Sequence, residues 1–528
     1  MQGTFNFILS AGESIKFNDR SSEGESWSKF KSNFVDDLGN DNSLMMENVP
    51  RYGVCPVCGT NATLKCGSCR REFYCDKSHQ SQDWPRHKST CGGWEIGRGP
   101  ALGRHLLATR DLAPGDVILS ETPLVWGPST HASQRVCVGC GGRCDDVGAR
   151  CGRCCWPVCR PDCGGLSDKK RHQLECALLA RARIIPRCEV LLVIRMLILW
   201  RTKSRRWTSL AKLQSHVESR GPGTEAHDEV SSVSQLLGPL LSMASDCGDL
   251  LPTICGLIDV NALETAPPEG SVAIYENASL LEHSCVANTR HDFRVDDKGR
   301  PRITVYAVTS IEKGEHLSTM YTHALWATRA RREHLLATKY FACRCKRCAD
   351  PTELGTHLGS LNCPCKNGLM LPNDPLNPNT DWSCDACPGT VTSTEVAQLT
   401  DKLEEEVAEV MKQATEHTLF DLLSRLTVLL HPGHQHCVSV SHSLMQLLPA
   451  TDPRKPELCK RVMDTVNRLD PHGARLALYT AVTLRELATC PGEDKRAHLA
   501  RAASLLKAEP PNSPGERLRR LVQVELCS

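Results

Sequence analysis

The order of apolar and polar positions predicts β-strands in two separate stretches of the chain. Leu106–Ala108 precede a turn at residues 113–116, and Val117–Leu119 follow it, so residues 106–125 are predicted to form a strand–turn–strand unit. Residues 303–308 form the strongest predicted strand, and a turn at 311–315 follows it. Strand character is therefore expected around residues 106–125 and again over 270–321.

The region between these stretches is predicted to be helical. Residues 177–260 carry apolar positions at helical spacing, among them Leu191, Ile194 and Ile198, and a polar gap at 215–230 predicts a loop. The apolar run at 190–200 is interrupted by Arg195 and is shorter than the ~20 residues that a helix needs to cross a bilayer. This run therefore predicts a buried helix.

A second helical region is expected from about residue 395 onward. Leu399, Leu403, Val407 and Val410 keep helical spacing. The pattern returns in segments separated mostly by Pro or Gly, namely 418–431, 436–449, 455–468, 471–489 and 493–507. Such repetition predicts stacked antiparallel helix pairs. Residues 1–50 are polar and weakly patterned, which predicts a mobile extension.

The most unusual feature of the composition is the number of cysteines. The 528 residues suggest several domains, and a net charge of +2 does not indicate strong binding to nucleic acid or to anionic membranes. The chain has 30 cysteines, which could form disulfides in a secreted protein or hold metal inside a cell. The first ten residues lack signal-peptide features, and the cysteines fall mainly in C-x2-C pairs near histidines, so zinc is favoured over disulfides.

The first cysteine–histidine cluster supplies eight ligands, enough for two tetrahedral zinc sites. Zinc takes four thiolate or imidazole ligands, and a two-residue spacer lets one turn present two thiolates to one ion. Interleaved pairing predicts one site from Cys55, Cys58, Cys75 and His79, and another from Cys66, Cys69, His87 and Cys91. The cluster closely resembles a MYND finger, with His79 where cysteine is usual. A RING-type ubiquitin ligase is the alternative, but the late histidine fits that ligand order poorly.

Two further groups of cysteines have the same character. The second cluster resembles a degenerate MYND-like module, with predicted sites at Cys137, Cys140, Cys159 and Cys163, and at Cys151, Cys154, His172 and Cys176. Cys144 and Cys155 are extra, so the choice of ligands there stays open. A later group resembles a small zinc ribbon, with predicted ligands Cys363, Cys365, Cys384 and Cys387.

Three motifs in fixed order resemble a SET methyltransferase domain. Residues 281–288 (LEHSCVAN) resemble N-H-S-C-x-P-N, residues 314–321 (GEHLSTMY) resemble G-E-E-x4-Y, and residues 341–348 (FACRCKRC) match the post-SET pattern F-x-C-x-C-x2-C. Behind a MYND finger, this order is similar to the SMYD (SET and MYND domain) protein methyltransferases, and the second cysteine module resembles the arthropod SmydA branch. The resemblance covers roughly residues 50–390, and the helical tail fits the family's C-terminal repeats.

The resemblance implies transfer of a methyl group from S-adenosylmethionine to a protein lysine, histone or non-histone. It implies that Tyr321 acts at the floor of the lysine channel, and that the fourth structural zinc ligand beside the post-SET Cys343, Cys345 and Cys348 is Cys285. The cofactor would contact residues from four segments, namely Gly103, Arg104, Asn261, Glu282, His283, Tyr321 and Phe341. A MYND finger implies proline-containing peptide partners.

Three residues depart from the family pattern. Glu282 replaces an asparagine that contacts cofactor, Arg104 replaces an asparagine of the early glycine turn, and Lys339 replaces a second channel tyrosine, next to Tyr340. Two functions therefore stay open, an active lysine methyltransferase and a catalytically weak or inactive scaffold that recruits partners in transcriptional or chromatin regulation. Residence in the cytoplasm, the nucleus or both is expected, because no long basic run marks one of them.

The expected fold is α+β, with a β-rich SET domain that contains an inserted helical region and zinc-bound MYND modules, followed by an all-α, TPR-like domain. The predicted borders are an extension at 1–50, a MYND finger at 51–93, the first SET part at 94–136, a second MYND-like module at 137–176, a helical insert at 177–260, the SET core at 261–325, a post-SET and ribbon segment at 326–390, and helical repeats at 391–528.

Overall fold

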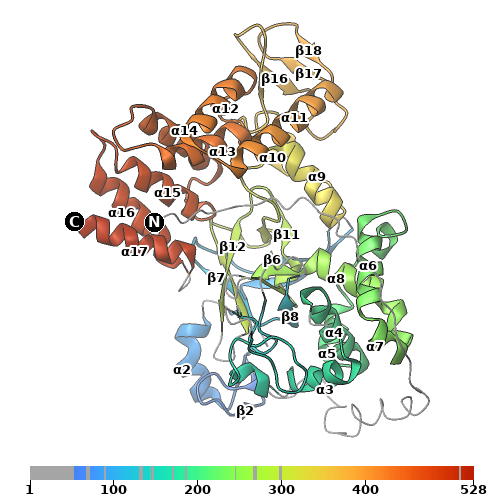
Figure 1. The fold of residues 1–528 in the computed structure, drawn as a ribbon. Coiled ribbons are helices and arrows are strands. Elements are labelled where there is room, and N and C mark those ends of the chain that lie inside the picture. Colours follow the sequence, from blue (N-terminus) through green and yellow to red (C-terminus); the bar gives the residue numbers. More distant parts are fainter. Residues whose placement is uncertain are drawn as a thin grey trace. The chain divides into compact units, whose positions relative to one another are not determined.

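The structure is a computed structural model, and Figure 1 labels its elements. It describes residues 53–66, 72–88, 91–100, 102–129, 135–142, 144, 148–168, 172–184, 187–243, 245–265, 270–295, 300–509 and 513–527. The extension predicted at residues 1–50 lies outside these ranges. Within them, no helix is both long and apolar enough to cross a membrane.

The β-structure is divided among small sheets built from both predicted stretches. Strand β6 (Gly103–Ala108) pairs with β5 (Trp94–Gly99) in a hairpin. Strand β13 (Pro301–Ala307) lies between two antiparallel neighbours, β7 (Val117–Glu121) and β12 (Thr289–Val295). A third sheet has the order β8 (Val125–Pro128), β10 (Ser271–Ile274), β9 (Leu263–Thr265). The predicted strands at 106–125 and 303–308 are thus confirmed.

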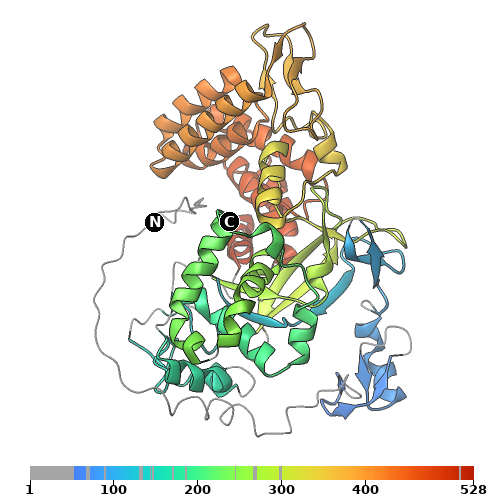
Figure 2. The ribbon, with the colours of Figure 1, turned by 90° about the vertical axis from the view of Figure 1, so that its right-hand side faces the viewer.

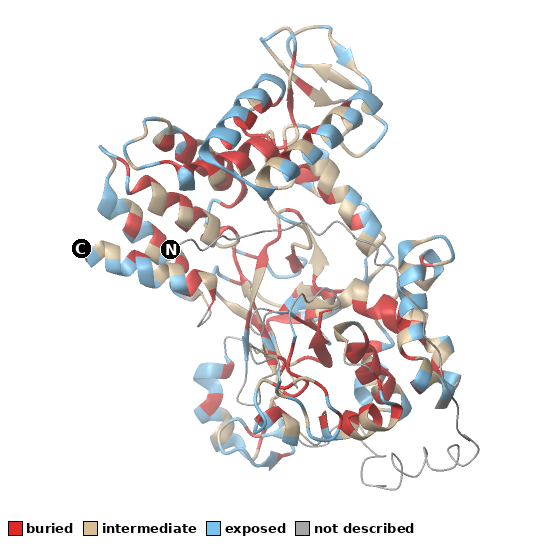
Figure 3. Ribbon diagram, viewed as in Figure 1, coloured by how far each residue is buried: buried red, intermediate tan, exposed pale blue. Residues whose placement is uncertain are grey.

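Alternating burial along these strands creates the core of this region. Ile303, Val305 and Ala307 of β13 are buried while the residues between them are not. Together with Leu106 of β6 and Ile118 of β7 they form one hydrophobic cluster. Figure 3 colours the buried residues red along the ribbon. The side-chain period of two places every second residue on the same face, so one pattern of apolar residues specifies both strand and core.

The region between the strands is helical, as predicted. Its elements are α3 (His172–Ala182), α4 (Cys188–Arg201), α5 (Arg205–Leu210), η2 (Val217–Ser219), α6 (Glu225–Leu236), α7 (Gly238–Met243), η3 (Ser245–Leu250) and α8 (Leu251–Asn261). The loop predicted at 215–230 is shorter, because the Thr224 side chain accepts a hydrogen bond from the His227 amide and starts α6 at Glu225.

Arg195 explains how a charged residue fits inside the buried helix α4. Its guanidinium forms an ion pair with Glu175 at 2.7 Å and donates to the carbonyls of Trp126 and Val138 at 2.8 and 2.9 Å. Because a buried charge is tolerated only when it is paired and hydrogen-bonded, Arg195 joins α4 to β8, α3 and the second cysteine module.

The C-terminal residues form successive helices that pack side by side (Figures 1 and 2). These are α11 (Ser393–Lys412), α12 (Glu416–Leu429), α13 (Gln435–Leu447), α14 (Arg454–Leu469), α15 (Ala477–Leu487), α16 (Lys495–Leu505) and α17 (Pro514–Cys527). The helix predicted from 471 begins at Ala477, because residues 471–475 form a turn on the Asp470 carboxylate. Helix α17 was not predicted. A TPR-like repeat stays a prediction.

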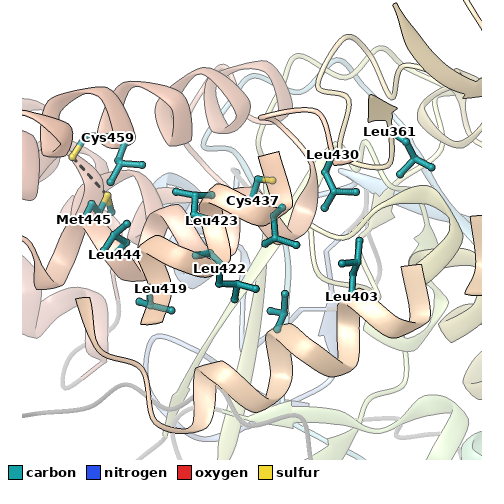
Figure 4. Close-up of a cluster of buried hydrophobic side chains, with 14 of the residues drawn as sticks. Leu361, Leu403, Leu419, Leu422, Leu423, Leu430, Cys437, Leu444, Met445 and Cys459 are labelled. Carbon is teal, nitrogen blue, oxygen red and sulfur yellow. Dashed lines mark hydrogen bonds between the residues drawn. The ribbon is translucent and has the colours of Figure 1, made fainter. Parts of the chain in front are cut away.

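A leucine-rich cluster holds the first of these helices together (Figure 4). Leu403 from α11, Leu422 from α12 and Leu444 from α13 are all buried in it. Cys437 and Cys459 also lie in this cluster, and the thiol of Cys459 is 3.6 Å from the sulfur of Met445. These two cysteines therefore fill the core as small apolar residues, as expected for cysteines outside the metal clusters.

Buried histidines make the stability of this helical region depend on pH. Burial lowers the pKa of His436 and His442 in α13 to about 4. The unfolded chain binds protons near pH ~6.5, so folding excludes protons and stability is lost as pH falls from ~6.5 towards 4, by at most on the order of 3 kcal/mol for each imidazole.

We therefore expect the double variant His436→Gln, His442→Gln to reduce this acid sensitivity. Hydrogen-exchange protection of α13 peptides, corrected for intrinsic rates, should fall between pH ~7 and ~5 in the native protein and fall less in the variant. His417→Gln is the control, because the His417 side chain is 85% exposed. Equal pH profiles for the native protein and the double variant would contradict this assignment.

Candidate active site and metal centres

The first predicted zinc site is assembled from two short turns and a helix. Cys55 and Cys58 lie on one turn, and Cys75 directly precedes α2 (Lys77–His87), which carries His79. Asp76 caps this helix by accepting a hydrogen bond from the His79 amide at 2.8 Å. The four ligand atoms lie within 4.8 Å of one another, as a single ion requires.

The second site of the MYND finger is described in part. The sulfurs of Cys66 and Cys91 are 3.5 Å apart, and His87 at the end of α2 is buried. The remaining predicted ligand, Cys69, lies outside the described residues, so its role stays a prediction.

The second cysteine module brings together both of its predicted ligand sets. Cys137, Cys140, Cys159 and Cys163 form one set, and Cys151, Cys154, His172 and Cys176 form the other. Neither set includes Cys144 or Cys155. In the second set, the Nδ1 atom of His172 is 3.4 Å from the Glu175 carboxylate. A carboxylate on the outer nitrogen orients an imidazole ligand towards its metal.

Two further thiolate sets lie later in the chain. Cys285 meets the post-SET cysteines, with its sulfur 3.9 Å from that of Cys343 and 3.5 Å from that of Cys348, and Cys345 completes the set. Cys363, Cys365, Cys384 and Cys387 form the other set on a four-stranded sheet, β15 (Leu361–Asn362), β16 (Leu369–Pro372), β17 (Trp382–Cys384) and β18 (Thr390–Val391).

The spacing of these sulfurs tests whether they suit zinc. A tetrahedral ion with zinc–sulfur bonds of about 2.3 Å separates its sulfurs by about 3.8 Å, whereas a disulfide holds them at about 2.05 Å. The sulfur–sulfur distances of 3.5 to 3.9 Å around Cys285 match the first value. All described cysteines are free thiols. Sulfur pairs of the second module and the ribbon are 3.6 to 3.8 Å apart, whereas Cys58 and Cys75 are closer, at 3.1 Å. The sets therefore fit zinc better than disulfides.

The candidate catalytic residues meet where two distant segments run in parallel. Strand β11 (Glu282–His283) pairs with β14 (Ser318–Thr319), so His283 lies beside the end of the second SET motif. The Nδ1 atom of His283 accepts a hydrogen bond from the Tyr321 amide at 3.0 Å. The ring of His283 lies 5.2 Å from that of Tyr321 and 5.8 Å from that of Phe341.

Burial sets the protonation of this group. It lowers the pKa of His283 to about 4, so the imidazole is neutral and its Nδ1 atom can accept a hydrogen bond. Burial, aided by the charge of Glu282, raises the pKa of Tyr321 above its ordinary value. The Tyr321 hydroxyl therefore keeps its proton, which it donates to the Leu281 carbonyl.

Three other predicted cofactor residues lie near the segment 212–214, which Arg104 and Asn261 contact directly. Gly103 adopts a φ of +62°, a backbone conformation that favours glycine. Next to it, the guanidinium of Arg104 donates to the Lys212 carbonyl at 2.6 Å. The amide of Asn261, at the end of α8, donates to the Gln214 carbonyl at 2.7 Å. The segment 212–214 thus ties the early glycine turn to α8.

Glu282 has a partner that sequence reasoning missed. Its carboxylate is 3.0 Å from Nδ1 of His316, whose ring stacks on His105 at 4.5 Å with an angle of 6°. The sequence contained a sign of this pair. Glu282 replaces the asparagine of the first motif, and His316 replaces the second glutamate of G-E-E-x4-Y. These two departures give the Glu282 carboxylate a partner 3.0 Å away in the Nδ1 atom of His316.

Lys339 is also held by backbone groups. Its ammonium donates to the carbonyls of Asp259 and Val260 at 2.9 and 2.8 Å, in the last turn of α8, where the helix dipole favours a cation. Burial lowers the pKa of Lys339, against the charge of Asp259. Tyr340 turns away, since its ring stacks on His216 at 4.9 Å and its hydroxyl accepts from Arg220 at 3.2 Å. Tyr340 therefore does not replace the second channel tyrosine.

The sequence is similar to known proteins along much of its length. Residues 55–91 match the MYND finger family, and residues 103–322 match the SET domain family. The chain is 30% identical over 324 residues to SET domain-containing protein SmydA-8, isoform A, of Drosophila melanogaster, covering 58% of this chain and 68% of that protein. It is 27% identical over 270 residues to N-lysine methyltransferase SMYD2 of Gallus gallus, covering 49% of this chain and 60% of that protein.

Among solved structures, the likeness is distant. The crystal structure of the SET domain of LSMT bound to lysine and AdoHcy covers 85% of this chain and 96% of that chain, at 12% identity and a TM-score of 0.27.

The ligand sets predict the metal content of the purified protein. We expect about six zinc ions per chain, one for each set of four predicted ligands, and about five after Cys345→Ser. Native mass spectrometry and elemental analysis measure both values. Cys527→Ser is the control, because Cys527 is exposed and belongs to none of these sets. Two ions or fewer in the unmodified protein would contradict the assignment.

Proposed function

Because the chain belongs to the SMYD family of SET and MYND domain proteins, we propose that it is an active lysine methyltransferase, which transfers a methyl group from S-adenosylmethionine to a lysine of a protein substrate. One observation carries this proposal. Tyr321, His283 and Phe341 converge at the parallel pairing of β11 and β14, directly beside the thiolates of the post-SET site. Relatives at 26–27% identity are named N-lysine methyltransferases, and the 30% identical SmydA-8 is named a SET domain-containing protein.

The reaction requires mainly alignment and exclusion of water. S-adenosylmethionine supplies the methyl group on a sulfonium, and the lysine amine must arrive neutral. Tyr321 is suited to orient that amine, since burial keeps its hydroxyl protonated and its amide is fixed on His283. The half-buried ring of Phe341 would hold the adenine, and Gly103 leaves the early turn open, because a Cβ added at this glycine would have no atom within 4 Å.

Glu282 has a defined part in this proposal. One oxygen of its carboxylate is 3.0 Å from Nδ1 of His316 and is therefore already engaged within the protein. The remaining oxygen can accept a hydrogen bond from the ammonium of the cofactor's amino-acid end, as the family's asparagine would with its amide oxygen. Arg104 and Asn261 then fix the wall of the site through segment 212–214.

A catalytically weak scaffold is the second candidate. It is favoured by Lys339, which stands in place of a channel tyrosine and whose ammonium is bonded to α8. With lysine at this position, Tyr321 is the single tyrosine hydroxyl expected in the lysine channel, which would weaken catalysis. In this case the MYND finger and the helical tail would recruit partners. Trp84 on α2 is 41% exposed and offers an aromatic surface of the kind that binds proline-containing peptides. The cytoplasm and the nucleus both suit either candidate.

Tyr321→Phe separates chemistry from binding. We expect S-adenosylmethionine affinity to change less than about threefold while methyl transfer falls about 10²–10³-fold, because the hydroxyl would orient the amine, whereas its other contact is the Leu281 carbonyl. Transfer is measured as S-adenosylhomocysteine release with a library of single-lysine peptides. Tyr340→Phe is the matched control and should retain most of the activity. Unchanged transfer in Tyr321→Phe would exclude its catalytic role.

The Glu282–His316 pair predicts a double-mutant cycle for cofactor binding. Calorimetry should show that Glu282→Asn and His316→Glu each weaken binding about tenfold, because Glu282→Asn removes the carboxylate that contacts His316 and His316→Glu places two carboxylates side by side. The double variant restores the family's usual residues and should recover most of the affinity. If the unmodified protein gives no heat at about 1 mM cofactor, the enzyme proposal fails and the scaffold remains.

A further inference from the structure

Arg331 is a fully buried arginine whose side chain lies against the post-SET thiolates. It belongs to α9 (Thr328–Lys339) and has 0% exposed surface. Its Nε atom donates to the sulfur of Cys285 at 3.2 Å, and its Nη2 atom donates to the sulfur of Cys348 at 3.4 Å. One guanidinium thus reaches two of the four proposed zinc ligands, from two different segments of the chain.

The other donors of Arg331 are also used. Nη1 donates to the Glu353 carboxylate at 2.7 Å and to the Trp326 carbonyl, and Nη2 donates to the Thr328 hydroxyl at 2.9 Å. A guanidinium has five N–H donors in a fixed plane, and each of them has a partner here. A lysine, with a single ammonium group, could not make this set of contacts.

The charges around this arginine are balanced against the metal site. A divalent ion with four thiolates carries an excess of two negative charges. Arg331 and Arg347 are both buried, and both contact Glu353, whose carboxylate is 3.1 Å from Arg347. The two arginines and the carboxylate add one positive charge, which offsets half of that excess. Without the thiolates, the buried group would carry an uncompensated cation.

We propose that Arg331 is a positioning residue that retains the post-SET zinc ion and thereby holds Phe341 over the cofactor site. Hydrogen bonds from a cation lower the proton affinity of the thiolates and stabilise the doubly negative charge of a zinc ion with four thiolates, so the loaded site is favoured over the protonated, empty one. Phe341 lies two residues before Cys343 and packs in the same cluster as Cys285 and Cys348. The zinc part stands independently, and the effect on the cofactor rests on the function proposed above.

The neighbouring contacts extend this role towards the helical region. The second oxygen of Glu353 accepts a hydrogen bond from the Thr328 amide at 2.8 Å, at the start of α9. The preceding amide, of Ala327, donates to the side chain of Gln435 at 2.7 Å, at the start of α13. The orientation of Arg331 is therefore set by the same residues that connect α9 to the C-terminal helices.

The test uses the full-length zinc-loaded protein and the variant Arg331→Met, which has a side chain of similar length without charge. We expect release of one zinc ion per chain to a chelator to become about tenfold faster or more, and S-adenosylmethionine affinity to fall with it. Arg329→Met is the matched control, since Arg329 lies on the same helix, is 38% exposed and pairs with Glu333 and Asp401. Zinc release at the native rate in Arg331→Met would overturn the proposal.

A second pair of variants separates the thiolate contacts from the ion pair. Glu353→Gln keeps Arg331 beside the sulfurs, so this variant should retain zinc nearly as well as the native protein. Its result does not depend on whether Arg331→Met folds well. The double variant Arg331→Met, Glu353→Gln removes both charged groups of this ion pair together, yet should still release zinc quickly. Full recovery in the double variant would show that only the ion pair matters, and would overturn the proposal.

Cobalt substitution adds a spectroscopic measurement. The thiolate-to-cobalt absorption of the native protein should differ from that of Arg331→Met, because hydrogen bonds withdraw charge from the sulfurs. Arg329→Met should match the native spectrum. Identical spectra for all three proteins would count against the contacts. These readouts need no cofactor, so failure of the native protein to bind S-adenosylmethionine would refute the enzyme and leave the zinc proposal standing.

Discussion

The contact of Cys285 with Cys343, Cys345 and Cys348 is the constraint on which the candidate active site depends. Cys285 follows β11, while the other three belong to a segment almost sixty residues later, so their meeting fixes the post-SET chain beside Tyr321 and His283. The strands at this contact, β11 and β14, have two residues each, and helix α9 adds Arg331 and Leu335 beside the sulfurs. The strength of metal–thiolate bonds compensates for the small amount of secondary structure at this point.

Other parts of the chain are built in the same way. Short turns carry most of the ligands in the MYND finger, the second module and the ribbon, where strands of two to four residues bury little apolar surface. Such small units need metal to remain folded. Large hydrophobic clusters lie instead among the SET strands and the C-terminal helices. The chain thus combines two cores of ordinary kind with several units that depend on zinc.

The departures from the family pattern share one physical feature: each altered polar group has a partner within the protein. Glu282 is paired with His316, Lys339 binds the end of α8, and Arg104 binds the Lys212 carbonyl. A charged residue without a partner would be costly at a half-buried site. Such pairing is expected of a site whose side chains hold fixed positions, whether the site serves catalysis or cofactor binding alone.

The sequence by itself determined the strands at 106–125 and 303–308, most C-terminal helices and the closely spaced cysteine pairs, because these depend on local spacing: one or two residues between thiolates, two or 3.6 residues between apolar positions. The assignment of Cys285 to the post-SET cysteines came from the family resemblance, and the structure brings these four thiols together. Only the tertiary structure decided which partners Glu282, Lys339 and Arg331 have. Those contacts join residues 17 to 80 positions apart, and no local period encodes them. Electrostatic pairing depends on distance in space, which the fold alone sets.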